Sequence, residues 1–330
     1  IEGVGAGIVI SASHNPFQDN GIKIFKTGGV KLSDEEEEKI EKYILESDDV
    51  PRGNVGKITV FSDGLQKYAD FLQAKFPAGK HNKKLKIVID CSNGAASKIG
   101  QVVFGEPMFD SHFIHNTPDG KNINDNCGSQ HTDDLKSKVI EKGADIGLAF
   151  DGDADRLIVV DEKGSEVTGD RILAVCAAYA KETNKLRNNT LVSTIMSNIG
   201  LGQALSAQGI EHLKAGVGDR LVLELMLKSG AVIGGEDSGH MIFLDEHTTG
   251  DGMLSALKLI EVMLEKKQAV SELASIMTVF PQVLINVEVD ASRPDYTKNK
   301  TIVNAIKEVE KELGDKGRVL VRYSGTQPMI

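Results

Sequence analysis

The chain has 330 residues, and its 48 Asp and Glu outnumber its 38 Lys and Arg to give a formal net charge of −10. This balance disfavours nucleic-acid binding, which needs a basic stripe on the surface. No apolar run is long enough for a transmembrane helix, no signal peptide is visible, and three cysteines without zinc spacing favour a reducing cytoplasm.

The first predicted element is an apolar strand, Ile8 to Ile10, that runs into Ser11-Ala-Ser13-His14-Asn-Pro16. Because Asn-Pro is incompatible with a helix, the strand should end in a tight turn that exposes Ser13 with a polar base beside it. A serine in this setting is typical of a nucleophile or of a phosphoryl carrier. Ser, Asn and Pro are also ordinary turn residues, so this segment alone leaves both interpretations open.

Alternating strand and helix patterns follow along the chain and predict mixed α/β layers. An acidic helix over Asp34 to Glu46 has Ser33 as its N-cap and carboxylates in its first turn, where the helix dipole favours them. The other predicted helices are Leu65 to Lys75, Asp170 to Lys181, Leu201 to Gln208, Arg220 to Leu227 and Thr301 to Leu313. The other predicted strands are Lys84 to Cys91, Asp145 to Phe150, Leu157 to Val160, Thr190 to Met196, Glu211 to Lys214, Ala231 to Ile233, Val283 to Val289 and Arg318 to Val321.

Three aspartates lie between two of these strands, in the loop Asp151-Gly-Asp153-Ala-Asp155-Arg156. Carboxylates at this spacing just past a strand make a hard, oxygen-rich site of the kind that holds Mg²⁺. The spacing partly resembles a calcium-binding EF-hand, but Arg156 stands where that loop needs Gly, and the preceding segment is predicted to be a strand. A solvated acidic turn is the weaker alternative, because hydrophobic strands flank the loop on both sides.

Two later loops follow strands and carry polar side chains among glycines. In the first, Gly234 to Gly239, a carboxylate and a hydroxyl two residues apart can meet vicinal hydroxyl groups with little steric interference. In the second, which begins at Arg322, hydroxyls and free backbone N–H groups surround a guanidinium and can bind phosphate. Viewed alone, the first loop could be a flexible connection and the second a surface hairpin turn.

In this order, the four loops resemble those of the α-D-phosphohexomutases, which carry a phosphoserine in an S-A-S-H-N-P type loop and Mg²⁺ on a D-G-D-x-D-R loop. The resemblance implies that Ser13 is phosphorylated. It implies that one Mg²⁺ per chain is held by that phosphate and by Asp151, Asp153 and Asp155. It also implies that sugar hydroxyls and a phosphate are bound by Glu236, Ser238, Arg322, Ser324, Gly325 and Thr326.

Several basic side chains fall where active-site groups of that family lie. His14, Lys23 on the turn that follows, and His240 are candidates for proton transfer or for positioning phosphate, a choice that depends on their reach to the sugar hydroxyl. Arg156 is expected beside the serine phosphate. Asp219 and the arginine after it resemble a loop that faces the cleft, although a helix N-terminus explains them almost as well.

The stretch Pro118-Asp-Gly-Lys-Asn-Ile-Asn-Asp-Asn-Cys-Gly-Ser129 bears on the choice of sugar. It resembles the corresponding segment of the family's bacterial glucosamine-phosphate branch more closely than those of phosphomannomutases or phosphoglucomutases, and Asp90 to Ala96 is similar in the same way. This resemblance implies an isomerase that interconverts glucosamine 6-phosphate and glucosamine 1-phosphate, with glucosamine or glucose 1,6-bisphosphate as intermediate and activator, on the route to UDP-N-acetylglucosamine and the cell wall. A mutase for mannose or glucose phosphates and a non-catalytic sugar-phosphate-binding protein remain alternatives. The chain departs from the family pattern at Asp237, Tyr323 and Gln327.

The resemblance covers nearly the whole chain and implies a multidomain α/β architecture. Three related mixed-sheet domains, the first incomplete, should precede a smaller and incomplete α+β domain, with the divisions 1–66, 67–168, 169–280 and 281–330. Relative to the family the chain looks truncated at both ends, so we expect it to have little or no activity by itself. The expected partners are small sugar phosphates, with no nucleic acid and no membrane, and a homodimer is a candidate assembly.

Overall fold

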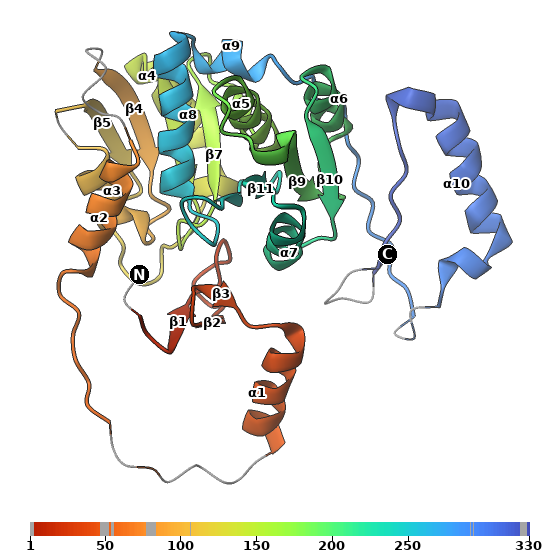
Figure 1. The fold of residues 1–330 in the computed structure, drawn as a ribbon, viewed down its shortest axis with the longest axis horizontal. Coiled ribbons are helices and arrows are strands. Elements are labelled where there is room, and N and C mark those ends of the chain that lie inside the picture. The colour runs from red at the N-terminus through yellow and green to blue at the C-terminus, as the bar shows by residue number, and fades with distance from the viewer. Residues whose placement is uncertain are drawn as a thin grey trace.

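Three β-sheets organise the part of the chain that the structure describes (Figure 1). The structure is a computed structural model, and it describes residues 3–46, 53, 56–76, 84–105, 107–290, 292, 294–323 and 329–330. The sheets follow one another along the chain, so each belongs to a separate unit.

The first unit is a small antiparallel sheet followed by an acidic helix. Its strands pair in chain order and are β1 (Ala6–Ile10), β2 (Ile22–Lys26) and β3 (Val30–Lys31). Helix α1 (Asp34–Glu46) begins where the sequence predicts, because Glu36 N donates to Ser33 Oγ (3.3 Å) and Ser33 N donates to Glu36 Oε2 (2.8 Å).

Lys23 lies inside β2, opposite Val9, so the prediction that it lies on a turn is wrong. The segment Ile22-Lys-Ile24 alternates apolar and polar residues, which is the signal of a half-buried strand. The strand pairing with β1 orders this segment, and it fixes the direction in which the lysine projects.

The second unit is a five-stranded mixed sheet with the strand order β5-β4-β6-β7-β8. Its strands are β4 (Leu85–Asp90), β5 (Phe109–Ile114), β6 (Ile146–Phe150), β7 (Leu157–Asp161) and β8 (Glu166–Val167). Its helices are α2 (Gly64–Ala74), α3 (Ala96–Val103) and α4 (Asp133–Lys142). Because β6 and β7 are adjacent and antiparallel, the loop 151–156 between them is held at one end of the sheet.

The third unit has a four-stranded sheet with the order β10-β9-β11-β12, in which only β12 is antiparallel. Its strands are β9 (Thr190–Thr194), β10 (Glu211–Ala215), β11 (Ile233–Gly235) and β12 (Met241–Phe243). Its helices are α5 (Gly169–Glu182), α6 (Ile199–Ala207), α7 (Asp219–Ser229), α8 (Gly252–Lys266) and α9 (Val270–Ala274). The sequence pattern did not predict α3, α4, α8, α9, β2, β3, β5, β8 or β12.

The last part of the chain carries α10 (Lys300–Leu313), which confirms the helix predicted there. The strands predicted over 283–289 and 318–321 are wrong, because within the described residues their only pairing is an isolated bridge between Glu288 and Met329. Apolar side chains such as Val283 are exposed here, at 84% of their surface. A strand-like sequence becomes a strand only against a partner, and these segments lack a described one.

One hydrophobic core runs from the second unit into the third. It joins side chains of β6 and β7, such as Leu148 and Leu157, to side chains of α5 and α8, such as Leu173 and Leu257. Helix α8 lies beside α5 in Figure 1 and packs against α5, β7 and β12, which is why most of its residues are buried. Of the helices described, none has the length and apolarity that crossing a membrane requires.

Candidate active site

Ser13 lies in a tight turn directly after β1, as predicted. Ser11 N donates to Gly21 O (2.9 Å), and Asn15 N donates to Ala12 O (3.1 Å), which closes the turn. Ser13 has a left-handed φ of 55°, a conformation that is uncommon outside glycine and that concentrates at functional sites. The residue is half-buried instead of exposed, because its Oγ turns inward and donates to Asp151 Oδ2 at 2.7 Å.

The three aspartates of the loop 151–156 converge as the sequence predicts. One oxygen from each of Asp151, Asp153 and Asp155 lies within 4.8 Å of the others. Asp151 is fully buried, and its Oδ1 accepts a hydrogen bond from Arg156 N at 3.1 Å. The loop therefore turns its carboxylates inward, towards the Ser13 hydroxyl, which excludes a merely solvated acidic turn.

Two cationic side chains lie against these carboxylates. Lys23 Nζ donates to Asp153 Oδ2 at 2.6 Å and to Asp155 Oδ2 at 3.0 Å. Arg156 Nε lies 3.9 Å from both Asp151 Oδ2 and Asp155 Oδ1. The first unit thus contributes a lysine and a serine to a site whose acidic groups come from the second.

The electrostatics of the loop favour a bound cation. Burial, followed by the charges of Asp155 and Asp153, raises the pKa of Asp151. Burial would also raise the pKa of Asp153, but the hydrogen bond and charge of Lys23 outweigh it and lower that pKa. Burial acts to lower the pKa of Lys23, and the two carboxylates outweigh it, so the pKa is raised and the ammonium keeps its charge.

The donor set of this loop fits Mg²⁺. Oδ1 of Asp153 and Oδ1 of Asp155 are buried and have no hydrogen-bond partner among the residues described. Buried carboxylate oxygens need a partner, and Mg²⁺ takes carboxylate and phosphate oxygens as ligands. A phosphate on Ser13 Oγ would stand beside the same cluster, since that oxygen already contacts Asp151.

The loop between β11 and β12 packs directly against the aspartate loop. Leu157 N donates to Gly239 O at 3.0 Å, and Arg156 and His240 form an isolated bridge. A Cβ at Gly239 would lie 2.3 Å from Leu157 O, and φ there is +93°, so only glycine permits this approach. The loop is shorter than predicted, because Gly234 and its neighbour belong to β11.

Several polar atoms of this loop are buried without a partner. Ser238 Oγ and both ring nitrogens of His240 have no hydrogen bond within the described part of the chain, and His240 is only 3% exposed. His240 Nε2 lies 3.6 Å from Asp219 Oδ2 and 3.9 Å from Asp155 Oδ2. Glu236 Oε1 accepts from Gly218 N at 3.2 Å. The free hydroxyl and imidazole are groups that a polar ligand can satisfy.

Asp237, which departs from the family pattern, binds α5. Its Oδ1 accepts from Asp170 N at 3.1 Å, and its carbonyl accepts from Gly169 N at 3.0 Å. The residue therefore holds the loop between β11 and β12 against the start of α5.

His14 stands beside the serine. Its Nδ1 lies 3.4 Å from Ser13 Oγ. Burial, followed by the positive charge of Arg156, lowers the pKa of His14 against the opposing charges of Asp155 and Asp153. The imidazole is therefore neutral at neutral pH and can accept a proton.

Two residues that the sequence did not predict reach the site. Asn124 Nδ2 donates to Ser13 O at 3.0 Å, and Lys31 forms an ion pair with Asp219. Burial would raise the pKa of Asp219, but His240 and Lys31 outweigh it and lower that pKa. Lys31 carries no recognisable motif, and Asn124 was visible only within the segment 118–129.

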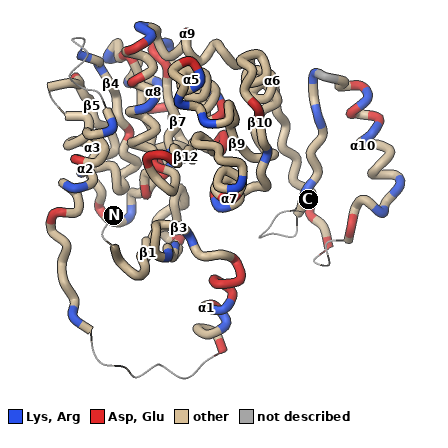
Figure 2. Tube along the Cα trace, viewed as in Figure 1, with Lys and Arg blue, Asp and Glu red and all other residues tan. Residues whose placement is uncertain are grey.

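A second contact joins the first and third units nearby. Arg220 of α7 forms an ion pair with Asp34 at the start of α1. Figure 2 shows that α1 begins with acidic residues at its end nearer α7. Asp219 and Arg220 therefore hold the first unit in place, which is a structural use of the pair that the sequence left open.

The predicted phosphate-binding loop is only partly described. Arg322 is exposed, and within the described residues no hydrogen bond or ion pair joins it to Ser13, Asp151 or His240. Ser324, Gly325 and Thr326 lie outside the described residues. A different arginine ties this end of the chain to the third unit, since Arg318 Nη2 donates to the carbonyls of Ile195 and Ser197 at 2.6 Å each.

A groove of about 440 Å³ lined by parts of α5, α8 and β12 shares no residue with this site. Four of the charged side chains in its lining form ion pairs with one another, Lys258 with Glu246 at 2.9 Å and Arg187 with Asp245 at 2.8 Å. Buried polar atoms without a hydrogen-bond partner among the described residues include Oδ1 of Asp153, Oδ1 of Asp155 and both ring nitrogens of His240, which lie near the aspartate loop.

The sequence matches four family profiles in chain order. They are described as phosphoglucomutase/phosphomannomutase alpha/beta/alpha domain I over residues 2–50, domain II over 66–164, domain III over 168–280 and the C-terminal domain over 284–330. These matches cover almost all of the chain and confirm the predicted multidomain α/β architecture.

Proteins similar in sequence to this chain are named phosphoglucosamine mutase. The phosphoglucosamine mutase of Desulforapulum autotrophicum is 56% identical over 100% of this chain and 75% of its own length. That of Clostridium tetani is 47% identical over 99% of this chain and 74% of its own. The chain thus spans about three quarters of these relatives.

Solved structures share the fold. Aspergillus fumigatus N-acetylphosphoglucosamine mutase, in complex with GlcNAc-6P and magnesium, matches 99% of this chain and 84% of its own with a TM-score of 0.75 and 18% identity. A phosphoglucomutase/phosphomannomutase family protein from Burkholderia thailandensis matches 86% of this chain and 60% of its own with a TM-score of 0.71 and 24% identity. From the four ordered profiles and the close sequence relatives, the chain belongs to the phosphoglucomutase/phosphomannomutase family.

Proposed function

We propose that this chain is a phosphoglucosamine mutase, an isomerase that interconverts glucosamine 6-phosphate and glucosamine 1-phosphate. The observation that carries the proposal is Ser13 Oγ hydrogen-bonded at 2.7 Å to Asp151, within a cluster of three carboxylates. A serine nucleophile beside an oxygen-rich cation site is what phosphoryl transfer requires. Relatives of that name, 47% to 56% identical over nearly the full chain, support the choice of an amino sugar.

The cation of the proposal is one Mg²⁺ per chain. Asp151, Asp153, Asp155 and the phosphate on Ser13 would hold it, and the partnerless oxygens of the second and third aspartates support this choice. Mg²⁺ bound there neutralises the charge that develops on the transferring phosphoryl group.

In the proposed reaction, phosphorylated Ser13 gives its phosphoryl group to the free hydroxyl of the sugar monophosphate. The bond from phosphorus to Ser13 Oγ breaks, a bond from phosphorus to the sugar oxygen forms, and the hydroxyl proton passes to a base. His14 suits that role because its lowered pKa leaves the imidazole neutral. Lys23 keeps its charge and donates hydrogen bonds to anionic oxygens.

The product of this step is glucosamine 1,6-bisphosphate, the intermediate of the proposal. Its other phosphate then returns to Ser13, which restores the phosphoserine and releases the isomeric monophosphate. The site must therefore accept the sugar in two orientations. Externally supplied glucosamine or glucose 1,6-bisphosphate would phosphorylate Ser13 by the same step and so act as an activator.

The remaining groups of the proposal bind substrate without taking part in bond changes. Glu236 and Ser238 contact sugar hydroxyls, and the buried hydroxyl without a partner in the described chain supports this assignment. His240, whose ring nitrogens make no hydrogen bond within the described residues, and Arg156 bind the transferring phosphate. The phosphate that does not transfer is held by Arg322, Ser324, Gly325 and Thr326. Their contacts, remote from the reacting centre, supply binding energy for the reaction there.

The division 1–66, 67–168, 169–280 and 281–330 gives each domain one of the four loops and is part of the proposal. We place the enzyme in the cytoplasm, which three free and buried cysteines support. A homodimer is the proposed assembly, to be checked by light scattering.

The proposal is tested on the natural protein by mass spectrometry and a coupled assay. Intact mass should show one phosphoryl group, absent from Ser13→Ala, and that variant should lose at least roughly 10³-fold in kcat while Ser206→Ala, an exposed serine on α6, keeps full activity. Glucosamine phosphates should be preferred over those of mannose and glucose. A Ser13→Ala variant as active as the control refutes the mechanism, and a preference for mannose or glucose refutes the choice of sugar.

A further inference from the structure

The amide of Asn124 joins the second unit to the serine turn of the first. Its Nδ2 donates to Ser13 O at 3.0 Å and to Asn15 O at 2.8 Å. The two protons of this single NH₂ group are thus both donated, to the carbonyls of the residues before and after His14. No other side chain within the described residues donates to these two carbonyls.

The backbone around Asn124 leaves little freedom to this side chain. The residue has a left-handed φ of 57°, which asparagine tolerates better than most residues, and its N–H donates to Ser92 O at 2.9 Å. Beneath it, a Cβ at Gly152 would lie 2.8 Å from Asn124 Nδ2 and 2.5 Å from Ser13 O. A short amide packed this closely has essentially one position.

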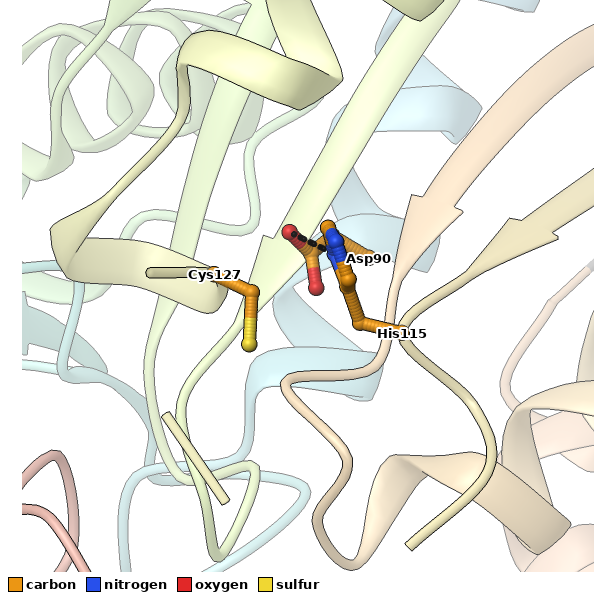
Figure 3. Close-up of side chains that lie close together, drawn as sticks. All are labelled: Asp90, His115 and Cys127. Carbon is orange, nitrogen blue, oxygen red and sulfur yellow. Dashed lines mark ion pairs between the residues drawn. The ribbon is translucent and has the colours of Figure 1, made fainter. Parts of the chain in front are cut away.

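The segment that carries Asn124 is fastened at both ends by Asp90. His115 Nδ1 lies 3.1 Å from Asp90 Oδ2, and Gly128 N donates to the same oxygen at 2.9 Å. Figure 3 shows the ring of His115 against the Asp90 carboxylate, with the sulfur of Cys127 close by. Oδ1 of Asp90 accepts from Ser92 N at 2.8 Å.

Asp90, His115 and Cys127 also have the spacing of a metal-binding group. Both oxygens of Asp90 already accept backbone N–H groups, and burial, followed by the charge of Asp90, raises the pKa of Cys127 to about 12. Asp90 thus joins the backbone at Ser92 and Gly128, and Cys127 Sγ accepts a long hydrogen bond from Asn93 Nδ2 at 3.9 Å. The cluster thus stiffens the segment from which Asn124 projects.

We propose that Asn124 is a positioning residue, which holds the backbone of the serine turn so that Ser13 Oγ stays directed at the aspartate cluster. This inference rests on the proposed function for its catalytic consequence. The double hydrogen bond fixes the carbonyls on either side of His14, and with them the left-handed conformation of Ser13. Reacting groups displaced by about 1 Å lose roughly 10²-fold in rate, so this contact sets the rate of phosphoryl transfer.

The test compares Asn124→Asp and Asn124→Gly with Asn126→Asp in the natural protein. Aspartate keeps the shape of Asn124 but faces both carbonyls with acceptors, and glycine keeps the left-handed backbone without strain and removes the amide. Asn126 is a matched control, because it has a φ of 50° in the same segment and, among the described residues, its amide donates to Asp125 alone.

Both Asn124 variants should lose kcat by roughly 10²-fold with KM changed less than about threefold, whereas Asn126→Asp stays near the wild type. Hydrogen exchange at the Ser13 and Asn15 amides should be faster by at least about tenfold, with unchanged protection in β4 and β6. Asn124 variants that match the control in both readouts overturn the inference. A wild type without mutase activity would refute the proposed function instead, and the exchange rates would still decide whether Asn124 holds the turn.

Discussion

Replacing Gly152 by alanine tests the close contact between the serine turn and the aspartate loop. A Cβ there would lie 2.5 Å from Ser13 O, whereas ordinary contact begins at 3.4 Å, a deficit of about 0.9 Å (3.4 − 2.5). The backbone of residue 152 also has little room to move away from the serine turn. Ala95 N donates to Gly152 O at 2.8 Å, and Gly94 packs so closely that a Cβ there would lie 2.2 Å from that oxygen. The serine turn must therefore move, together with the side chains of Asn124 and Ile123, which the same Cβ would approach to 2.8 Å and 2.9 Å.

A shift of this size should lower kcat by roughly 10²-fold, because phosphoryl transfer depends on the alignment of the serine oxygen. The same overpacking should cost about 1–3 kcal/mol of unfolding free energy. Steady-state kinetics in the natural protein and urea unfolding measure the two effects. Gly5→Ala is the control, since a Cβ at that glycine would meet no atom of the described chain within 4 Å. If Gly152→Ala is folded and its kcat lies within about twofold of the control, the reasoning about alignment is refuted.

Asp153→Asn should weaken Mg²⁺ binding by at least roughly tenfold in calorimetry, while Asp110→Asn, an exposed aspartate of β5, leaves it unchanged. Equal affinities in the two variants would contradict the assignment of the metal. Hydrogen bonding to Asp90 raises the pKa of His115 from 6.5 against the effect of burial, so the protonated ring stabilises the fold fully below that value. This stabilisation is lost as pH rises through the raised pKa, so the stability difference between wild type and His115→Gln should shrink from about pH 6 to about pH 9 in urea unfolding. A difference that is constant over that range would show that the ion pair contributes nothing.

The sequence could predict the groups of the site that lie within one loop. The spacing of Asp151, Asp153 and Asp155 and the turn after Ile10 are local patterns, and both predictions of local structure are confirmed. The contact between Ser13 and Asp151 spans 138 positions in sequence, and no local pattern encodes such a distance. The resemblance to a known family made that connection before the structure did.

The misses have separate physical causes. Helix α8 is buried on most sides, so its sequence lacks the polar face that gives an amphipathic helix its periodic signal. Its N-cap Asp251, whose side chain accepts from Leu254 N, was the one local signal of a helix start. The segment 283–289 has strand-forming residues without a described partner strand. Asn124 lies among several polar residues, and only the fold selects the one that reaches the serine turn.

The bridge between Arg156 and His240 has a consequence for motion. Together with the hydrogen bond from Leu157 N to Gly239 O, it joins the end of the second unit's sheet to the β11–β12 hairpin of the third unit. These contacts couple the aspartate loop to the loop between β11 and β12, so we expect the two loops to move together. If the proposed function holds, a sugar that reverses its ends would turn against these two coupled loops, and the change of shape that admits and releases it would occur in the other parts of the molecule.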